Sequence, residues 1–297
     1  MDGILNILKP PGMTSFDVVA HLRGLLGIRK IGHAGTLDPL AVGVLPVCIG
    51  RATKAIEFMM DKDKIYRAEL TLGVKTDTQD SSGNVLSTSD VKCTDEEIDQ
   101  AVQSFTEKYM QTPPMYSALK VDGKRLYDLA REGMQIERKQ REVVIFSSRV
   151  LRIDRSDGVR VMLDVHCSKG TYIRTLCADI GERLGCGGYM SFLLRKQAGP
   201  FEITSALTLE KLSLMKENGI IQNAFSSVEL VFTQLGSFTL NERTEKKFMN
   251  GMPVTVPNMT GTEDELIRVY SPANKFVALG YILRGEREIQ LRARKFI

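Results

Sequence analysis

The sequence predicts a mixed α/β (α+β) protein of 297 residues, with a large domain over about 1–235 and a small β domain over about 238–297. Two observations lead to this prediction. Before residue 200, stretches with an apolar residue at every second position alternate with stretches that carry an apolar helical stripe. Beyond residue 250, short apolar runs separated by turn residues are typical of a small barrel. The length is sufficient for one large and one small core.

Composition narrows the class of protein. Apolar residues make up 43% and charged residues 26%, which is ordinary for a folded soluble protein. We expect no membrane span, because no run of about 18 apolar residues occurs, and no signal peptide, because the N-terminus lacks the required order of charge and apolar residues. The 5 cysteines are odd in number and form no CxxC pair, which predicts reduced thiols in a cytoplasm and no disulfide framework or zinc site.

The chain begins with a predicted strand over Ile4–Leu8, which the rigid turn Lys9-Pro10-Pro11-Gly12 follows. Ser15 is then a suitable N-cap for a helix. Its apolar face would carry the following residues: Val18, Val19, Leu22, Leu25 and Leu26.

A glycine-framed loop with a lone carboxylate, Asp38, follows over Gly32–Pro46. Glycines permit close backbone approach and positive φ, and Pro39 biases Asp38 toward an extended backbone. The loop leads into Val44–Ile49, an apolar stretch that we expect to be buried. A carboxylate held on a firm loop beside apolar walls suits covalent or acid–base chemistry. The alternative is that Asp-Pro only starts a turn.

Strict alternation over Lys64–Val74 predicts a half-buried strand with Tyr66 on the core side. A polar loop over 75–83 follows, and Thr94 with Glu97 forms a capping box for a helix that runs through Phe105.

The segment 117–142 is the most basic of the chain, and Tyr116 and Tyr127 lie beside its cations. Its basic residues are Lys120, Lys124, Arg125, Arg131, Arg138, Lys139 and Arg141. Cations can hold phosphates while aromatic rings stack on unpaired bases, so this composition suits RNA binding. A solvated surface hairpin explains it equally well.

Two predicted strands, Val143–Ile153 and Val159–Cys167, precede a helix that ends at Gly185. Arg174 lies in the first turn of this helix and off its apolar stripe. A cation is poorly placed at a helix N-terminus, so we expect another anion to hold Arg174, although an ordinary surface arginine is the alternative. Residues 222–237 show little periodicity and are expected to form a connection. Beyond it we predict a helix ending at Gly251 and strands over Val254–Val256, Leu266–Tyr270, Phe276–Leu283 and Ile289–Phe296.

Four blocks resemble the tRNA pseudouridine-55 synthases, the TruB family of pseudouridine synthases. They are Lys9–Ser15 (a KPxGxTS form), Gly32–Pro46 (GHAGTLDPLAVGVLP), Cys167–Leu176 (CSKGTYIRTL) and Ser191–Phe201 (an LRRTxxGPF form). The resemblance implies a mixed, largely antiparallel sheet flanked by helices, a basic thumb insertion near 117–142 and a C-terminal PUA-type RNA-binding domain. It also implies that the protein converts uridine to pseudouridine at position 55 in the T arm of tRNA.

The resemblance assigns roles to residues of the pocket. Asp38 would be the catalytic residue and Arg174 its ion-pair partner, Tyr66 would stack on the target base, and Leu193 would pack under it. Tyr172 would belong to the pocket, and His33 would fill the space left by the flipped base. A core tyrosine and a core or second-layer histidine are the alternatives for Tyr66 and His33.

For RNA contacts the expected residues are Lys9, Lys124, Arg125 and Arg131, with a solvated charge as the alternative for Lys9. Leu194 and Lys196 depart from the family pattern and put a local RNA or salt-bridge contact in doubt. We expect the positive charge of Arg174 to lower the pKa of Asp38 by more than burial raises it.

The chemistry requires no cofactor and no metal, and we expect a cytoplasmic monomer that acts on tRNA without a protein partner. Two other functions fit the sequence: a guide-RNA-dependent pseudouridine synthase and a non-catalytic RNA-binding or tRNA-folding protein. The sequence does not distinguish direct attack of Asp38 on C1′ from a glycal-type route.

Overall fold

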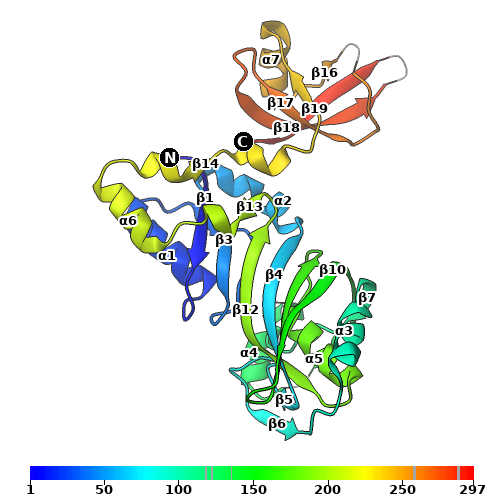
Figure 1. Ribbon diagram of the computed structural model, residues 1–297. Coiled ribbons are helices and arrows are strands. Elements are labelled where there is room, and N and C mark those ends of the chain that lie inside the picture. Colours follow the sequence, from blue (N-terminus) through cyan, green and yellow to red (C-terminus); the bar gives the residue numbers. More distant parts are fainter. Residues whose placement is uncertain (118, 122, 135, 257–258, 286–287) are drawn as a thin grey trace.

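The computed structural model describes residues 1–117, 119–121, 123–134, 136–256, 259–285 and 288–297. A ten-stranded sheet dominates this described part, with the order β14-β1-β3-β12-β4-β11-β10-β7, while β13 pairs with β12 and β2 with β3 (Figure 1). Its strands are β1 (Gly3–Lys9), β2 (Ile31–His33), β3 (Val42–Ile49), β4 (Lys64–Leu72), β7 (Glu107–Gln111), β10 (Arg141–Asp154), β11 (Val159–Cys167), β12 (Gly188–Ala198), β13 (Phe201–Glu202) and β14 (Phe225–Ser226). The pairs are antiparallel except for β12 with β3. The predicted mixed, largely antiparallel sheet is therefore confirmed.

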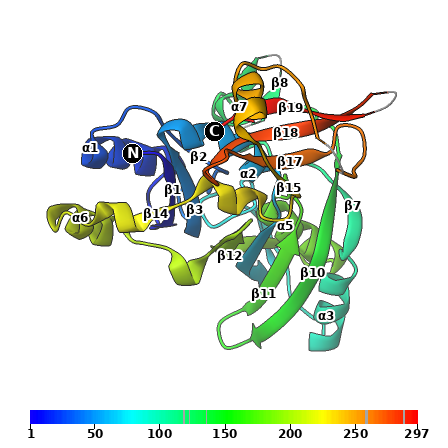
Figure 2. The same ribbon diagram turned by 90° about the horizontal axis from the view of Figure 1, so that it is seen from above.

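The α-helices are α1 (Ser15–Leu26), α2 (Ile56–Met60), α3 (Asp95–Gln103), α4 (Leu126–Arg131), α5 (Ile173–Arg183), α6 (Leu209–Glu217) and α7 (Glu242–Met249). Four 3₁₀ helices join them among the described residues: η1 (Gly50–Ala55), η2 (Ile203–Ser205), η3 (Ile221–Ala224) and η4 (Val228–Phe232). Helices α3 and α5 lie together beside the β4, β10 and β11 end of the sheet (Figure 2). Their buried side chains share one core with these strands, whereas α1 and α6 pack with β1 and β3 in a separate core.

The predicted periodicities match the strands and helices closely. β4 alternates buried and half-buried residues along its whole length, with Tyr66 on the buried side. The capping box of Thr94 and Glu97 is present at the start of α3. The predicted N-cap of α1 is wrong, because Thr14 caps this helix together with Asp17. Ser15 is instead buried, and its hydroxyl serves the loop of Asp38.

The segment 222–237 is more than the aperiodic connection that we expected. It contains η3, β14 and η4, and its Val231 and Phe232 are buried. β14 pairs with the first strand, β1, so this late segment closes one edge of the large sheet. Two-residue strands and 3₁₀ turns are too short for a periodic signal.

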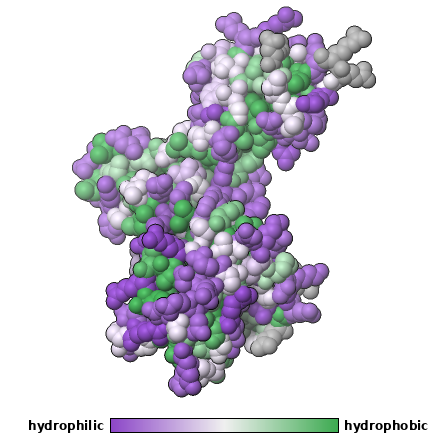
Figure 3. All heavy atoms as spheres, turned by 45° about the vertical axis from the view of Figure 1, so that its right-hand side comes forward, coloured by the Kyte–Doolittle hydropathy of each residue, from purple (hydrophilic) through white to green (hydrophobic). Residues whose placement is uncertain are grey.

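A five-stranded sheet of order β15-β17-β18-β19-β16 follows and curls into a half-barrel. Its strands are β15 (Ser237–Thr239), β16 (Val254–Thr255), β17 (Leu266–Tyr270), β18 (Phe276–Arg284) and β19 (Ile289–Phe296). This sheet packs against the large domain through three aromatic rings. The ring of Phe232 on η4 lies 5.2 Å from that of Phe58 on α2 and 6.0 Å from that of Phe276 on β18. In Figure 3, hydrophilic residues cover much of both parts and are interspersed with small hydrophobic patches. No helix in the described ranges is long and apolar enough to cross a membrane.

Candidate active site

Asp38 lies on an irregular loop between β2 and β3, as the Asp-Pro pair predicts. Gly35 on this loop and Gly43 at the start of β3 have backbone conformations that suit glycine, with φ of +110° and +113°. A Cβ on Gly43 would lie only 2.3 Å from the carbonyl oxygen of Arg195 on β12. Gly43 therefore allows the start of β3, directly after the loop, to pack closely against β12.

A buried ammonium group anchors the loop after Asp38. Lys9 Nζ donates hydrogen bonds to the carbonyl oxygens of Pro10 at 2.9 Å, Met13 at 2.6 Å and Pro39 at 3.0 Å. Burial lowers the pKa of Lys9 to about 8, although the negative charge of Asp38 opposes this shift. The prediction that Lys9 contacts RNA is wrong, because its side chain is fully buried and the three carbonyls occupy its donors.

Ser15 holds the residue before Asp38. Its hydroxyl donates to the carbonyl oxygen of Leu37 at 3.2 Å and accepts from the Leu37 N–H at 2.9 Å. Lys9 and Ser15 are the first and last residues of the sequence block KPPGMTS. This block therefore holds the loop on both sides of Asp38.

Arg174 forms the predicted ion pair with Asp38. Its Nε lies 2.9 Å from Asp38 Oδ2 and its Nη2 lies 3.3 Å from Asp38 Oδ1, so the guanidinium grips the carboxylate with two donors. Nη2 also donates to the carbonyl oxygen of Tyr116 at 2.9 Å. The expectation that an anion holds Arg174 is confirmed, and the alternative of an ordinary surface arginine is wrong, because the residue is only 5% exposed.

A second carboxylate, Asp80, completes this network. Its Oδ2 lies 3.4 Å from Arg174 Nη1, which also reaches the carbonyl oxygen of Thr78 at 3.4 Å. Asp80 lies on the loop between β5 (Val74–Thr76) and β6 (Val85–Thr88), where it accepts hydrogen bonds from Thr78 and Ser82. The polar loop was expected from the sequence, but the role of Asp80 was missed, since nothing local links it to Arg174.

Burial raises the pKa of Asp38, and the charge of Asp80 adds to this effect. The positive charges of Arg174 and Lys9 act in the opposite direction, but the net shift is upward. The expectation that the ion pair dominates and lowers the pKa is therefore wrong. The free-energy cost of removing the Asp38 carboxylate from water is larger than the stabilisation that the Arg174 guanidinium provides.

This shift predicts a pH dependence. If turnover requires ionised Asp38, activity is lost as the pH falls through a pKa above the ordinary value of 3.8. We expect the acid limb of the single-turnover rate to lie higher than an exposed aspartate would place it, in a range where circular dichroism shows a folded protein. An acid limb at or below the ordinary value would mean that Arg174 dominates after all.

Of the other predicted pocket residues, three lie near this pair, and His33 lies directly before the Asp38 loop. Tyr66 on β4 and Leu193 on β12 are buried in one core cluster with Leu37 and Ala41 of the Asp38 loop. Tyr172 directly precedes α5, and its backbone is clamped by Gln111, which accepts from the Tyr172 N–H at 2.8 Å. His33 ends β2, and burial lowers the pKa of its imidazole. The structure thus brings these residues to one region, while their roles toward a base stay predictions.

The side chains of Lys124, Arg125 and Arg131 lie outside what the structure describes. Their backbones belong to β9 (Lys124–Arg125), which pairs with β8 (Lys120–Val121), and to α4. Of the two departures from the family pattern, Lys196 binds Asp164 at 2.9 Å, next to the Arg67–Asp164 pair. Leu194 lines an apolar groove with Leu8 and Val42. Neither residue touches Asp38 or Arg174 in the contacts of the described residues.

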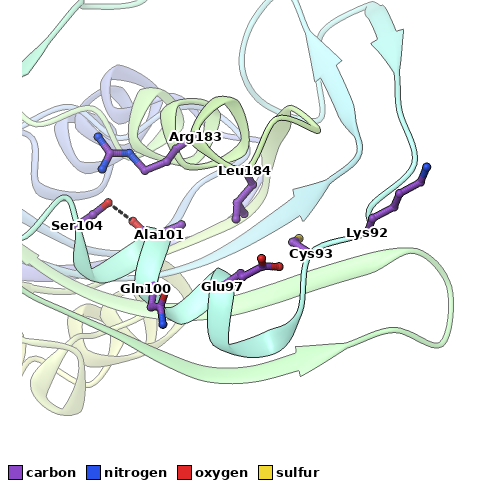
Figure 4. Close-up of a pocket in the computed structure, with 8 residues that line it drawn as sticks. All are labelled: Lys92, Cys93, Glu97, Gln100, Ala101, Ser104, Arg183 and Leu184. Carbon is purple, nitrogen blue, oxygen red and sulfur yellow. Dashed lines mark hydrogen bonds between the residues drawn. The ribbon is translucent and has the colours of Figure 1, made fainter.

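An open hollow of the surface lies elsewhere, between α3 and the end of α5 (Figure 4). Its lining is Lys92, Cys93, Glu97, Gln100, Ala101, Ser104, Arg183 and Leu184. None of the predicted site residues borders it, so we place the active site at the Asp38–Arg174 pair on chemical grounds. No three metal-binding side chains gather anywhere in the described residues.

Comparison with known proteins identifies the family of this chain. Residues 23–173 match the family described as "TruB family pseudouridylate synthase (N terminal domain)", and residues 174–225 match "tRNA pseudouridylate synthase B C-terminal domain". A relative from Clostridioides difficile (strain 630), named tRNA pseudouridine synthase B, is 44% identical over 99% of both chains. Another of that name, from Alkaliphilus oremlandii (strain OhILAs), is 49% identical over 84% of this chain and 82% of its own.

Solved structures show the same fold. A chain in the crystal structure of a Cbf5-Nop10-Gar1 complex has 27% sequence identity and a TM-score of 0.77, covering 99% of this chain and 84% of that one. A chain in an H/ACA RNP bound to a substrate RNA that contains 2'-deoxyuridine has 25% identity and a TM-score of 0.76. The sequence matches and the fold lead to the same conclusion: this chain belongs to the TruB family of pseudouridylate synthases.

Proposed function

We propose that the protein isomerises uridine to pseudouridine at position 55, in the T arm of tRNA. The observation that carries the proposal is Asp38, a carboxylate on a firmly anchored loop whose two oxygens are gripped by the buried Arg174. The curated relatives support tRNA as the substrate, since they are named tRNA pseudouridine synthase B. The T arm and position 55 follow from the family that the signature loop resembles.

The reaction breaks the N1–C1′ bond, turns the uracil and forms a C5–C1′ bond. The C5 hydrogen is lost and N1 gains a proton, so atoms balance without a redox partner or a phosphate donor. Asp38, held ionised and oriented by Arg174, either attacks C1′ or assists departure of the base. Proximity in a buried site makes either route effective, because the reacting groups need no further ordering.

The target base has to leave its stack before it can react. Tyr66 would stack on the extruded uracil, Leu193 would pack beneath it, and Tyr172 would close the pocket. His33 would occupy the space that the base leaves. Burial raises the pKa of Tyr66, so the phenol stays protonated at neutral pH and stacking is its main role.

The proposed organisation has a catalytic domain over 1–235 and a PUA-type RNA-binding domain over 238–297, to which the half-barrel corresponds. The protein would act as a cytoplasmic monomer without a cofactor or an obligate protein partner. The guide-RNA-dependent alternative is less well supported, because the identity is 44–49% to the tRNA enzymes and 25–27% to the chains in the H/ACA and Cbf5 structures. A purely RNA-binding role leaves the Asp38–Arg174 pair without a purpose.

One assay tests this function. The purified protein alone is incubated with an unmodified tRNA transcript, and pseudouridine is located by chemical mapping. We expect one modified uridine in the T arm and none in a transcript in which that uridine is replaced by cytidine. Activity that appears only after a guide RNA or partner proteins are added would favour the guide-dependent alternative.

The basic segment 117–142 yields a separate prediction for tRNA affinity. Neutral replacements of Lys124, Arg125 and Arg131 should weaken binding and flatten its salt dependence, since each lost phosphate contact lowers the log–log slope by about 0.7–0.9. The matched control replaces Arg152 on β10 and Arg160 on β11, which pair with Asp154 and Asp157. An unchanged slope in the first variant would place the segment on a solvated face.

A further inference from the structure

Arg195 carries a buried charge to which the roles above assign no function. It is 1% exposed and is the largest fully buried side chain of the described residues. No carboxylate of the described residues forms an ion pair with it, and a buried charge is costly unless hydrogen bonds satisfy it. The acceptors that satisfy this guanidinium therefore indicate what it does.

Three of its hydrogen bonds go to the backbone around Asp38. Nη2 donates to the carbonyl oxygen of Gly35 at 3.1 Å, Nη1 to that of Thr36 at 3.4 Å, and Nε to that of Val44 at 2.7 Å. One rigid fork thus grips the chain on both sides of Asp38. Lys9 holds Pro39 independently, so the loop is fixed at several points by two buried cations.

The same guanidinium reaches Tyr66. Arg195 and Tyr66 are directly paired across β12 and β4, and both point to the buried side of the sheet. Burial raises the pKa of Tyr66, and the positive charge of Arg195 lowers it by less. A guanidinium can only donate, so any hydrogen bond between the two side chains would have the phenol oxygen as acceptor.

We propose that Arg195 is a positioning residue that sets the Asp38 loop and the Tyr66 phenol at a fixed separation. It touches no reacting atom itself. Lysine cannot replace it, because a single ammonium cannot reproduce a planar fork that spans Gly35, Thr36 and Val44. This inference rests on the proposed function, since it concerns residues assigned there to the reaction.

The test uses the full chain and a T-arm RNA under single-turnover conditions. We expect Arg195→Lys to lower the rate at saturating enzyme at least tenfold, while the Kd for RNA changes less than about threefold. In a Tyr66→Phe background the same substitution should cost at least threefold less, because part of its effect passes through the phenol. The matched control is Lys196→Gln, the next residue on β12, which pairs with Asp164 and should keep the rate within twofold.

A rate within twofold of the unaltered chain in Arg195→Lys, or a loss that is undiminished in the Tyr66→Phe background, would overturn the proposal. If Arg195→Lys does not fold, a crystal structure of the unaltered chain with bound T-arm RNA decides. Arg195 should then lie within about 3.5 Å of both the Gly35 carbonyl oxygen and the Tyr66 phenol, and separation from either one would end the idea. An unaltered chain that forms no pseudouridine would instead contradict the proposed function.

Discussion

Asp38→Asn is expected to abolish pseudouridine formation while the affinity for tRNA stays within about tenfold, or about 1.4 kcal/mol. The amide keeps the size of the side chain but cannot act as a nucleophile or carry the negative charge that a departing base requires. Binding depends instead on many contacts spread over the RNA. Pseudouridine is scored by chemical mapping and affinity by filter binding on the same preparation.

Asp164→Asn is the matched control for this substitution. Asp164 also holds an arginine through two donors, with Arg67 Nε at 2.7 Å and Nη2 at 2.8 Å, but it lies on β11 away from the pocket. It should keep nearly full activity. Appreciable turnover by Asp38→Asn, with deamidation excluded by mass spectrometry, would remove Asp38 from the chemistry.

Arg174→Ala is expected to lower the single-turnover rate by about a hundredfold or more. Without the guanidinium, Asp38 and Asp80 both lose the cation that pairs with them, and Arg174 no longer offsets the repulsion between the two carboxylates. The pKa of Asp38 then rises further, so the acid limb of the rate moves to higher pH. Arg174→Lys should be intermediate, because lysine restores the charge but not the two-donor grip.

Arg67→Ala provides the comparison for Arg174→Ala, since it breaks an Arg–Asp pair of similar geometry at the outer face of the sheet. We expect little change in rate, as exposed pairs contribute about 0–1 kcal/mol. If both alanine variants lose activity equally, the loss reflects stability and not the pocket. Melting temperatures of the two variants separate these cases.

Much of the architecture could be predicted from periodicity. The alternation in β4 and the apolar stripe of α5 both reflect burial against one core, and burial leaves a clear pattern in sequence. Helix α6, β14 and β15 escaped prediction, because their short or polar sequences depend on partners distant in the chain. The active site followed from its motifs, which placed Asp38 and Arg174 together.

The roles of three other residues near the site could not be predicted from the sequence, and the reason is physical. Lys9, Arg195 and Asp80 are polar side chains whose partners are backbone carbonyls or groups from distant strands. A sequence shows that such a residue is charged, but it does not show that the residue is buried. For this reason the sequence led to a predicted RNA contact for Lys9 and did not reveal the structural roles of Arg195 and Asp80.

The anchoring of the Asp38 loop has a consequence for synthesis of the protein. Asp38 is held by Arg174, 136 residues later, and Gly35 by Arg195, 160 residues later. When the ribosome has synthesised the whole Asp38 loop, Arg174 and Arg195 have not yet been added to the chain. The loop therefore lacks both cations that hold it in the folded protein. Contacts this distant in sequence form slowly, so we expect truncated products and early folding intermediates that contain Asp38 to be catalytically inactive.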